Sequence, residues 1–413
     1  MKEPSPPDAP TKVIVAIFAL QIVLLTIGIT RDYQLKHEDN NALHATFARS
    51  HLHLGLKATR AQNYFYNPRS GSGSFYSNHP PGPGLVLAVV YGITGHDGPT
   101  ITRAVAIGFH VLGTWLFYGL LRRVLRQRWE LLVAMVLYVV LPESAFFGRM
   151  MNHEVLVLPA TILLVRGYWE SAHGTWSQRR SMAAIVIGAL CAAISGWAGF
   201  FAIGACALHA GWEVLVRRNP RATPSFVVLL VAGPVLFALA IAHLLWILGG
   251  DLTYLRGLLA SRSGGEAGIV RWLGRIIELH WRYFGLTSAV GVVALAYRAA
   301  RRRSGDPLDP AQEVGLIFLL AGAGYVAVFK FTATIHDYWQ FLLLPSSALG
   351  IVLLMRSLIG ATAQQGRRWL RRTLVTVAVL DIVVVTTVTL VQRHVKREGY
   401  CLEVVEQLRR NSL

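Results

Sequence analysis

The sequence is dominated by long apolar runs that are separated by short clusters of arginine. Eleven such runs lie at about 13–29, 101–121, 131–147, 155–169, 182–196, 198–215, 225–249, 283–297, 314–332, 339–355 and 373–391. A helix of roughly 20 apolar residues spans the hydrocarbon core of a bilayer. Hydrophobic residues make up 54% of the chain and charged residues 15%, which is too apolar for an ordinary soluble protein of 413 residues. The sequence therefore predicts an all-α, polytopic membrane protein with about 11 transmembrane helices.

The arginine clusters predict how these helices are oriented. If the N-terminus is cytoplasmic, every inner loop carries positive charge, as the positive-inside rule requires. These loops contain Arg122, Arg123, Arg126 and Arg128, then Arg179-Arg180, Arg217-Arg218 with Arg221, Arg298 with Arg301 to Arg303, and Arg356 to Arg372. The net charge of +18 is then explained by loops at an anionic leaflet, and we expect no binding to nucleic acid.

Two outer segments are long enough to have structure of their own. In residues 30–100, the apolar stretch from Gly84 to Gly95 is too short to cross, so we expect a helix at the outer interface. Residues 250–282 interleave arginines with Leu, Ile and Trp, which predicts a helix along the lipid headgroups. Its arginines, Arg271 and Arg275 among them, would bind a substrate phosphate or anchor the loop to anionic lipid.

The remaining segments give no sign of a second domain. A short tail, 392–413, would lie outside despite Arg393, Lys396 and Arg397. There is no separate soluble segment and no internal repeat, so we expect residues 1–413 to form a single transmembrane domain. Asp381 lies well inside the last apolar run, and the sequence offers no partner for it.

Three polar clusters lie where apolar runs meet the outer face. They are His37-Glu38-Asp39-Asn40, Asn152-His153-Glu154 and His336-Asp337-Tyr338. Ionisable residues at membrane depth are costly and usually functional, so one shared site is predicted. Outward-facing carboxylates suit a sugar-transferring enzyme, because the attacking acceptor needs a general base. Glu38 and Asp39 would point about 100° apart on a helix, so only one of them can be that base.

The clusters and their surroundings resemble a known family. The acidic pair follows the first span, Ala48-Arg49 lies a short helix later, and Asn78-His79-Pro80-Pro81 opens the interfacial segment. Arg149 precedes the second cluster, and the third runs into Leu342-Leu343-Leu344-Pro345. In this content and order the chain resembles the type C membrane glycosyltransferases, in particular bacterial enzymes related to protein O-mannosyltransferases and lipid A aminoarabinose transferases. The resemblance covers about residues 10–360.

This resemblance implies a reaction and its site. It implies an inverting glycosyltransferase of the bacterial inner membrane that moves a hexose or pentose from a polyprenyl-phosphate donor to a glycan, lipid or protein acceptor at the periplasmic face. Asp39 becomes the candidate base, with Glu38 and Glu154 as further catalytic candidates. The substrate-binding candidates are His79, near the donor phosphate, and Asn78, Arg49, His153, Arg149, His336, Asp337 and Tyr338. No metal or other cofactor is expected, although Glu38, Asp39 and Glu154 could bind a divalent cation.

Two departures from the family pattern leave alternatives open. Aligned on Ala48-Arg49, the family's acidic pair falls on Asn40-Asn41, so the choice between Glu38 and Asp39 stays open. Ser195-Gly196-Trp197 replaces a lysine that some relatives have after the fifth span, which leaves the sugar undefined.

A transporter or lipid flippase is the alternative function. Carboxylates and histidines along a pathway can also move protons. The polar clusters gather at one face, however, and the sequence shows no inverted repeat. This arrangement favours the enzyme.

Overall fold

The computed structural model describes residues 9–33, 37–68, 70–264, 268–300, 309–364 and 368–395. The predicted inner arginines Arg301 to Arg303 and the tail from 396 onward lie outside the described residues. The helices in chain order are α1 (Thr11–Thr26), α2 (Glu38–Ala58), α3 (Gly82–Thr94), α4 (Pro99–Val124), α5 (Arg128–Val140), α6 (Pro142–Phe147), α7 (His153–Ala172), α8 (Gln178–Ser195), α9 (Ala198–Leu215), α10 (Thr223–Ile247), α11 (Leu252–Ser263), α12 (Ile269–Ala300), α13 (Pro310–Val328), α14 (Lys330–Ile335), α15 (Leu344–Gln364) and α16 (Arg368–Val395). Two 3₁₀ helices are η1 (Pro220–Ala222) and η2 (Asp337–Leu343), and strands β1 (Tyr64–Asn67) and β2 (Ser72–Phe75) form an antiparallel hairpin with Tyr64 opposite Phe75.

The chain is a multi-pass membrane protein. Eight stretches of the described residues are helical, long enough and apolar enough to cross a bilayer. They are Pro99–Val124, His153–Ala172, Ala198–Leu215, Pro220–Ile247, Ile269–Ala300, Pro310–Val328, Asp337–Gly360 and Arg372–Gln392. The other three predicted spans also form helices, but α1 and α5 have only 16 and 13 residues, and α8 begins with Gln178-Arg179-Arg180.

The predicted span at 131–147 is wrong as a continuous helix. Helix α5 ends at Val140, and α6 begins at Pro142 after an extended Leu141 with ψ 137°. Proline has no backbone N–H and disfavours a helical conformation in the residue before it. The average hydropathy of the run does not show this break, but Pro142, followed by Glu143 and Ser144, marks it in the sequence.

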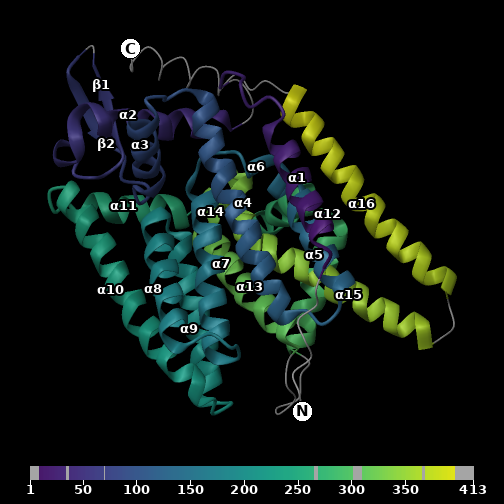
Figure 1. Ribbon diagram of the computed structural model, residues 1–413. Coiled ribbons are helices and arrows are strands. Elements are labelled where there is room, and N and C mark those ends of the chain that lie inside the picture. The colour runs from purple at the N-terminus through teal and green to yellow at the C-terminus, as the bar shows by residue number, and fades with distance from the viewer. Residues whose placement is uncertain are drawn as a thin grey trace.

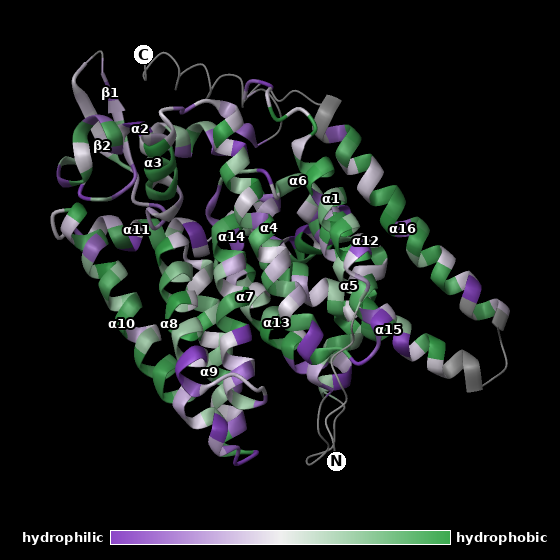
Figure 2. Cartoon of the chain, in the orientation of Figure 1, coloured by the Kyte–Doolittle hydropathy of each residue, from purple (hydrophilic) through white to green (hydrophobic). Residues whose placement is uncertain are grey.

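Helix α7 lies at the centre of the bundle, and α10 and α16 lie at its edges (Figure 1). In the membrane-spanning part of α7, 89% of residues are buried, against 11% in α10 and in α16. The two outer helices are hydrophobic on most of their surface (Figure 2), as expected for helices that face lipid. The residues that begin α7 are thus enclosed by other helices.

One end of the bundle carries the outer loop, which is more ordered than the sequence predicted. Helices α2 and α3 and the β-hairpin lie together there (Figure 1). The stretch expected to be mostly a polar loop contains helix α2, which is kinked at Gly55 (φ 78°, ψ 160°). Its acidic first turn, Glu38 and Asp39, is favourable at the positive end of the helix dipole. Helix α3 has 13 residues and is too short to cross, as predicted.

Candidate active site

The three polar clusters predicted from sequence come together at this end of the bundle. His37 Nε2 lies 2.7 Å from Asp337 Oδ1, which joins the first cluster to the third. The Asn41 side-chain oxygen accepts a hydrogen bond of 2.6 Å from the backbone N–H of Met151, which joins the start of α2 to the segment before α7. Segments more than 100 residues apart in sequence therefore form one site.

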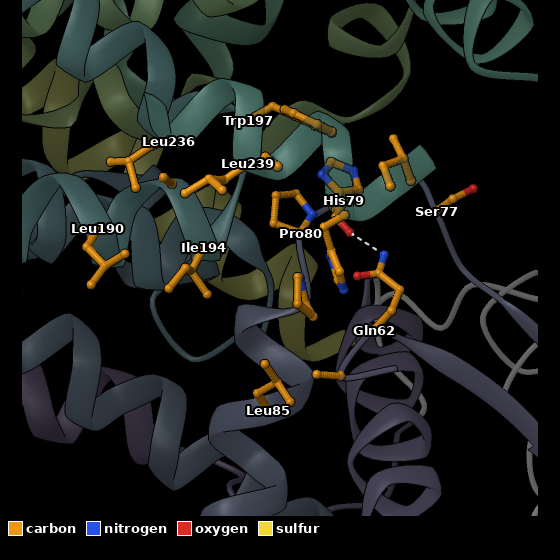
Figure 3. A pocket seen from close by; sticks show the side chains of 16 residues that line it. Gln62, Ser77, His79, Pro80, Leu85, Leu190, Ile194, Trp197, Leu236 and Leu239 are labelled. Carbon is orange, nitrogen blue, oxygen red and sulfur yellow. Dashed lines mark hydrogen bonds between the residues drawn. The ribbon is translucent and has the colours of Figure 1, made fainter. Parts of the chain in front are cut away.

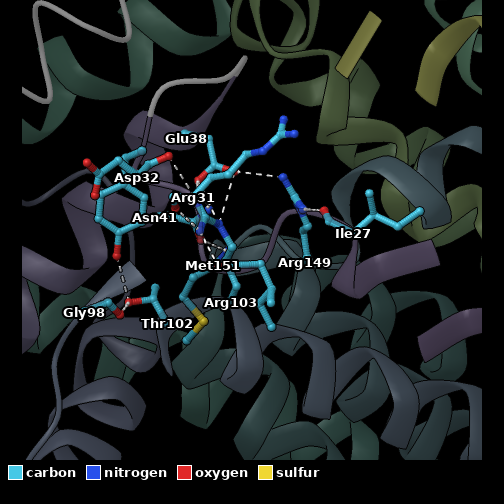
Figure 4. A network of polar contacts seen from close by, with 12 residues as sticks. Ile27, Arg31, Asp32, Glu38, Asn41, Gly98, Thr102, Arg103, Arg149 and Met151 are labelled. Atoms are coloured by element: carbon cyan, nitrogen blue, oxygen red, sulfur yellow. Dashed lines mark hydrogen bonds and ion pairs between the residues drawn. The ribbon is translucent and has the colours of Figure 1, made fainter. Parts of the chain in front are cut away.

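Glu38 lies in a buried network of arginines (Figure 4). Arg103 Nη2 is 2.8 Å from Glu38 Oε2, and Arg149 Nη2 is 3.3 Å from Glu38 Oε1. The Asn41 amide also donates to Glu38 Oε2 at 2.9 Å. Arg103 donates in addition to the backbone oxygens of Ile29, Arg31 and Asp32. Both oxygens of Glu38 are therefore already occupied by donors from the protein.

Asp39 occupies a different environment from its neighbour. It is half-buried in the first turn of α2. The carboxylates of Asp39 and Glu154 both act electrostatically on the hydroxyls of Tyr76 and Tyr338. Asp39 therefore faces the junction of α2, the Tyr76 loop, α7 and η2, where an acceptor could be deprotonated.

Glu154 lies in the first turn of α7 and is 1% exposed. The hydroxyl of Tyr325 is 3.5 Å from its Oε1, whereas its Oε2 has no hydrogen-bond partner among the described residues. A buried oxygen without a partner is costly, and a bound hydroxyl group would satisfy it. Glu154 is thus placed to receive a substrate hydroxyl.

His79 is fixed in the loop that precedes α3 (Figure 3). Gln62 donates to the backbone oxygens of Tyr76 and His79, at 2.8 and 3.1 Å. The His79 ring stacks on His153, with centroids 3.8 Å apart. Burial and the neighbouring His153 and Arg262 hold the pKa of His79 well below its usual value. The imidazole is therefore neutral, and it is not itself the cation expected beside a phosphate.

Arg262, near the end of α11, supplies a cation at this point. Its Nη1 lies 3.4 Å from His79 Nε2, and the residue is 9% exposed. A guanidinium is charged at any physiological pH and matches the geometry of a phosphate. The pair formed by His79 and Arg262 combines a neutral hydrogen-bonding ring with a fixed positive charge.

Two apolar cavities adjoin this pair. The first, of about 360 Å³, is lined by His79, Pro80, Ile194, Trp197, Leu236 and Leu239 among others (Figure 3). The second, of about 370 Å³, has Arg262 in its wall together with Trp197, Phe200 and Leu258. The Trp197 indole lines both cavities and donates to the backbone oxygen of Asn78 at 2.8 Å. An apolar chain in either cavity would place its polar end beside Arg262 or His79.

The remaining residues of the second and third clusters are also at the site. The His153 ring bonds to the backbone oxygen of Ser195 at 3.0 Å. The Tyr338 ring packs edge-on against His37 and lies next to His336, with ring centroids 5.4 and 5.2 Å apart. Of these residues, His153, His336 and Tyr338 were predicted from the sequence as substrate-binding candidates.

Three candidate arginines are not brought to Asp39. Arg49 pairs with Asp97, Nε to Oδ2 at 2.5 Å, on a half-exposed surface. Arg275 pairs with Glu278 at 2.8 Å and donates to the backbone oxygen of Thr334, and Arg271 is exposed. The cation of the 250–282 loop that reaches the site is Arg262.

The sequence analysis did not identify two buried charged residues near the site, Arg103 and Glu143. Arg103 stands alone in an apolar run, and an isolated arginine at membrane depth is a signal that could have been used. Glu143 in α6 is fully buried, neither of its oxygens has a hydrogen-bond partner among the described residues, and it lies within electrostatic reach of Asp337 and Glu154. Glu143 lies inside the predicted span 131–147, so the same signal, an ionisable residue at membrane depth, could have marked it.

In the part of the chain that is described, ligand atoms with metal-like spacing occur at His173, Glu213 and Glu313. This group lies at the other end of α7, about 30 Å from His153 by the rise of the helix. Arg217 Nη1 is 2.5 Å from Glu213 and 2.6 Å from Glu313, so a protein cation already occupies the space between the carboxylates. The group therefore acts as an ion-pair cluster that joins α9 to α13.

No family model and no curated protein matches the sequence. Solved structures do match. Archaeal oligosaccharyltransferase AglB from Archaeoglobus fulgidus, in complex with an inhibitory peptide and a dolichol-phosphate, has a TM-score of 0.60 at 13% identity, over 92% of this chain and 55% of that one. ArnT from Cupriavidus metallidurans bound to undecaprenyl phosphate has a TM-score of 0.59 at 14% identity, over 98% of this chain and 78% of that one.

At such low identities the similarity shows the fold alone. The chain spans about half the length of AglB and a larger share of ArnT. The chain thus has the polytopic, all-α fold of AglB and ArnT, and the fold class predicted from the sequence is confirmed.

Proposed function

We propose that this protein is an inverting glycosyltransferase that moves a sugar from a polyprenyl-phosphate donor to an acceptor at the outer, periplasmic face of a bacterial inner membrane. The observation that carries this proposal is the convergence of Asp39, Glu154 and the pair formed by His79 and Arg262 at one end of a type C bundle. AglB and ArnT, the similar structures, hold dolichol-phosphate and undecaprenyl phosphate. The sugar and the acceptor, a glycan, lipid or protein, stay open.

Asp39, Arg262 and Glu154 each have a role in the proposed sugar transfer. Asp39 removes the proton from the acceptor hydroxyl or amine as its oxygen or nitrogen attacks the anomeric carbon. The bond from that carbon to the phosphate oxygen breaks on the opposite face, so the configuration inverts and polyprenyl phosphate leaves. Arg262 pairs with the phosphate in the bound donor and as it leaves, and Glu154 binds a sugar or acceptor hydroxyl.

The two apolar cavities suit the lipid part of such a donor. Both are lined mostly by apolar side chains, and the first has His79 in its wall and the second Arg262. A lipid chain in one of them would exclude water and place its phosphate against the guanidinium. The cavities also explain how a sugar donor could be delivered from within the membrane, where nucleotide sugars do not occur.

The direct test is a transfer assay with the purified protein. Incubation with a panel of polyprenyl-phosphate sugars and a mixture of envelope acceptors should release polyprenyl phosphate, detected by mass spectrometry. The variant Asp39→Asn is the matched control. Movement of the lipid across proteoliposomes, with no release under any condition and no dependence on Asp39, would instead favour the flippase.

Substitutions at the donor site should change affinity more than turnover. Arg262→Gln removes a charge that contacts phosphate in both the ground and transition states, so the KM for the donor should rise by about 10- to 100-fold. His79→Ala should also raise KM, but less, because the ring is neutral. Steady-state kinetics with varied donor measure both parameters, and Arg271→Gln, on the exposed face, is the control. An effect on kcat alone would contradict this assignment.

Activity should survive removal of divalent metal. Of the three carboxylates that could form a metal site, Glu38 is already neutralised by Arg103 and Arg149. Transfer measured in EDTA should therefore match the untreated rate to within about twofold. Full loss in EDTA, restored by Mn²⁺ or Mg²⁺, would show that Asp39 and Glu154 act through a cation.

A further inference from the structure

Helix α12 is broken inside the membrane, and an aspartate from another helix lies at the break. Gly285 has φ +80° and ψ 164°, which interrupts the helical hydrogen bonds. The Leu286 and Thr287 N–H groups lose their partners in the preceding turn and donate instead to Asp381, to Oδ1 at 3.3 Å and Oδ2 at 2.8 Å. Asp381 of α16 therefore caps the second half of α12.

Gly285 and Asp381 pack closely together at the break. A side chain at Gly285 would bring its Cβ within 2.8 Å of Asp381 Oδ2, and the positive φ disfavours any residue other than glycine. Within a bilayer, water is not available to satisfy free backbone N–H groups, so a break of this kind needs a protein acceptor. This explains an acidic residue in the middle of an otherwise apolar span.

The first half of α12 carries contacts that reach the active site. The Tyr283 hydroxyl donates to Asp337 Oδ2 at 2.5 Å, and His280 bonds to Gln340 in η2 at 2.9 Å. The other His280 nitrogen lies 3.2 Å from Ser288 Oγ, across the break. The geometry of the break therefore determines where Tyr283 meets Asp337.

Asp337 in turn holds the start of α2. Its Oδ1 is 2.7 Å from His37, the residue immediately before the helix, whose φ of 61° is unusual for a residue with a side chain. Asp39 follows two residues later. Contacts thus run without interruption from Asp381 through Gly285, Tyr283 and Asp337 to the turn that carries Asp39.

We propose that Asp381 is a positioning residue: by capping α12 at Gly285 it keeps Tyr283 on Asp337 and so fixes the His37 turn and the position of Asp39. The catalytic part of this inference rests on the proposed function. The structural part does not, because the position of the His37 turn can be measured without an active enzyme.

Hydrogen–deuterium exchange on the purified full-length protein in detergent tests the structural part. Asp381→Leu should raise exchange at least tenfold in peptides that cover 280–290 and also in those that cover 37–45. Asp381→Asn keeps one of the two side-chain oxygen acceptors, enough for the shorter bond from Thr287, and should therefore stay much closer to wild type than Asp381→Leu. Thr386→Val is the matched control, because Thr386 also joins α16 to the bundle, through the backbone oxygen of Val140 at 2.9 Å, and is not at the break.

Three outcomes would overturn the proposal. They are increased exchange confined to 280–290, the same increase in Thr386→Val, and an Asp381→Asn variant that behaves like Asp381→Leu. If Asp381→Leu does not fold, Gly285→Ala can be used instead. It disrupts the same contact from the α12 side and should increase exchange in the same two regions.

Kinetics test the catalytic part. Asp381→Leu should lower kcat by about tenfold with the donor KM unchanged, and Asp381→Asn should restore it. Combining Asp381→Leu with Tyr283→Phe should cost little more than either change alone, because both act through Asp337. Additive losses would refute the shared route. If wild type shows no transfer but exchange behaves as expected, the positioning contacts stand and the proposed reaction fails.

Discussion

Replacing Asp39 with asparagine should lower the rate of sugar transfer by roughly 10²- to 10⁴-fold. Asparagine keeps the size of the side chain and most of its hydrogen bonds, but it cannot accept the proton of the acceptor. Binding of the donor should change little, because Arg262 and the apolar cavities are untouched. Single-turnover kinetics and donor affinity, measured on the same preparation, separate the two effects.

Two other carboxylates, Asp97 and Glu38, provide the controls for Asp39→Asn, because their contacts differ from those of Asp39. Asp97→Asn changes a half-exposed carboxylate at the same end of the bundle and should leave transfer unchanged. Glu38→Gln, if it folds, should reduce transfer less than Asp39→Asn does. Should a folded Glu38→Gln be inactive while Asp39→Asn is near wild type, Glu38 is the base. Full activity in both variants would refute the proposed mechanism.

The common site could be predicted because it depends on features that a linear sequence records. Each polar cluster borders an apolar run, and the arginine clusters place all three on the same side. The same pattern identified the class of fold. A short helix between the acidic pair and Ala48-Arg49 was implied by the family resemblance, but the full extent of α2 was not predicted, because its polar first turn lies in a segment with the composition of a loop.

The choice between Glu38 and Asp39 could not be made from sequence, because it depends on Arg103. That residue lies 65 positions after Glu38 and contacts it only because α4 packs beside α2. The departure of the motif from the family pattern left the same question open. The contacts of Glu38 with two buried arginines favour Asp39, because both oxygens of Glu38 are already occupied by donors from the protein.

The choice of Arg262 as the proposed donor-binding cation also could not be made from the sequence. Residues 250–282 contain several arginines with similar apolar neighbours, and nothing local distinguishes Arg262 from Arg271 or Arg275. What selects Arg262 is the direction of α11, which brings its end to the His79 loop. Tertiary packing, and not the local sequence pattern, decides which of several similar arginines reaches the His79 loop.

Replacing Arg103 with leucine should destabilise the folded protein by about 3–5 kcal/mol, the usual effect of removing one partner from a buried ion pair. Arg103 is fully buried, and it satisfies Glu38 as well as three backbone oxygens after α1. Its loss leaves the buried carboxylate of Glu38 with the Asn41 amide and one more distant cation, Arg149 at 3.3 Å, and removes the donor to those backbone oxygens. Thermal unfolding in detergent should show a clear fall in Tm.

The pair formed by Arg49 and Asp97 provides the matched comparison. It also joins a guanidinium to a carboxylate at the same end of the bundle, but its side chains are about one third and one half exposed. Arg49→Leu should therefore cost no more than about 1 kcal/mol. The double change Arg103→Leu with Glu38→Leu should recover part of the stability lost in Arg103→Leu, since it removes the unpaired carboxylate. A Tm for Arg103→Leu equal to that of Arg49→Leu would mean that Glu38 is not held as an ion pair, and the physical reason for preferring Asp39 as the base would be lost.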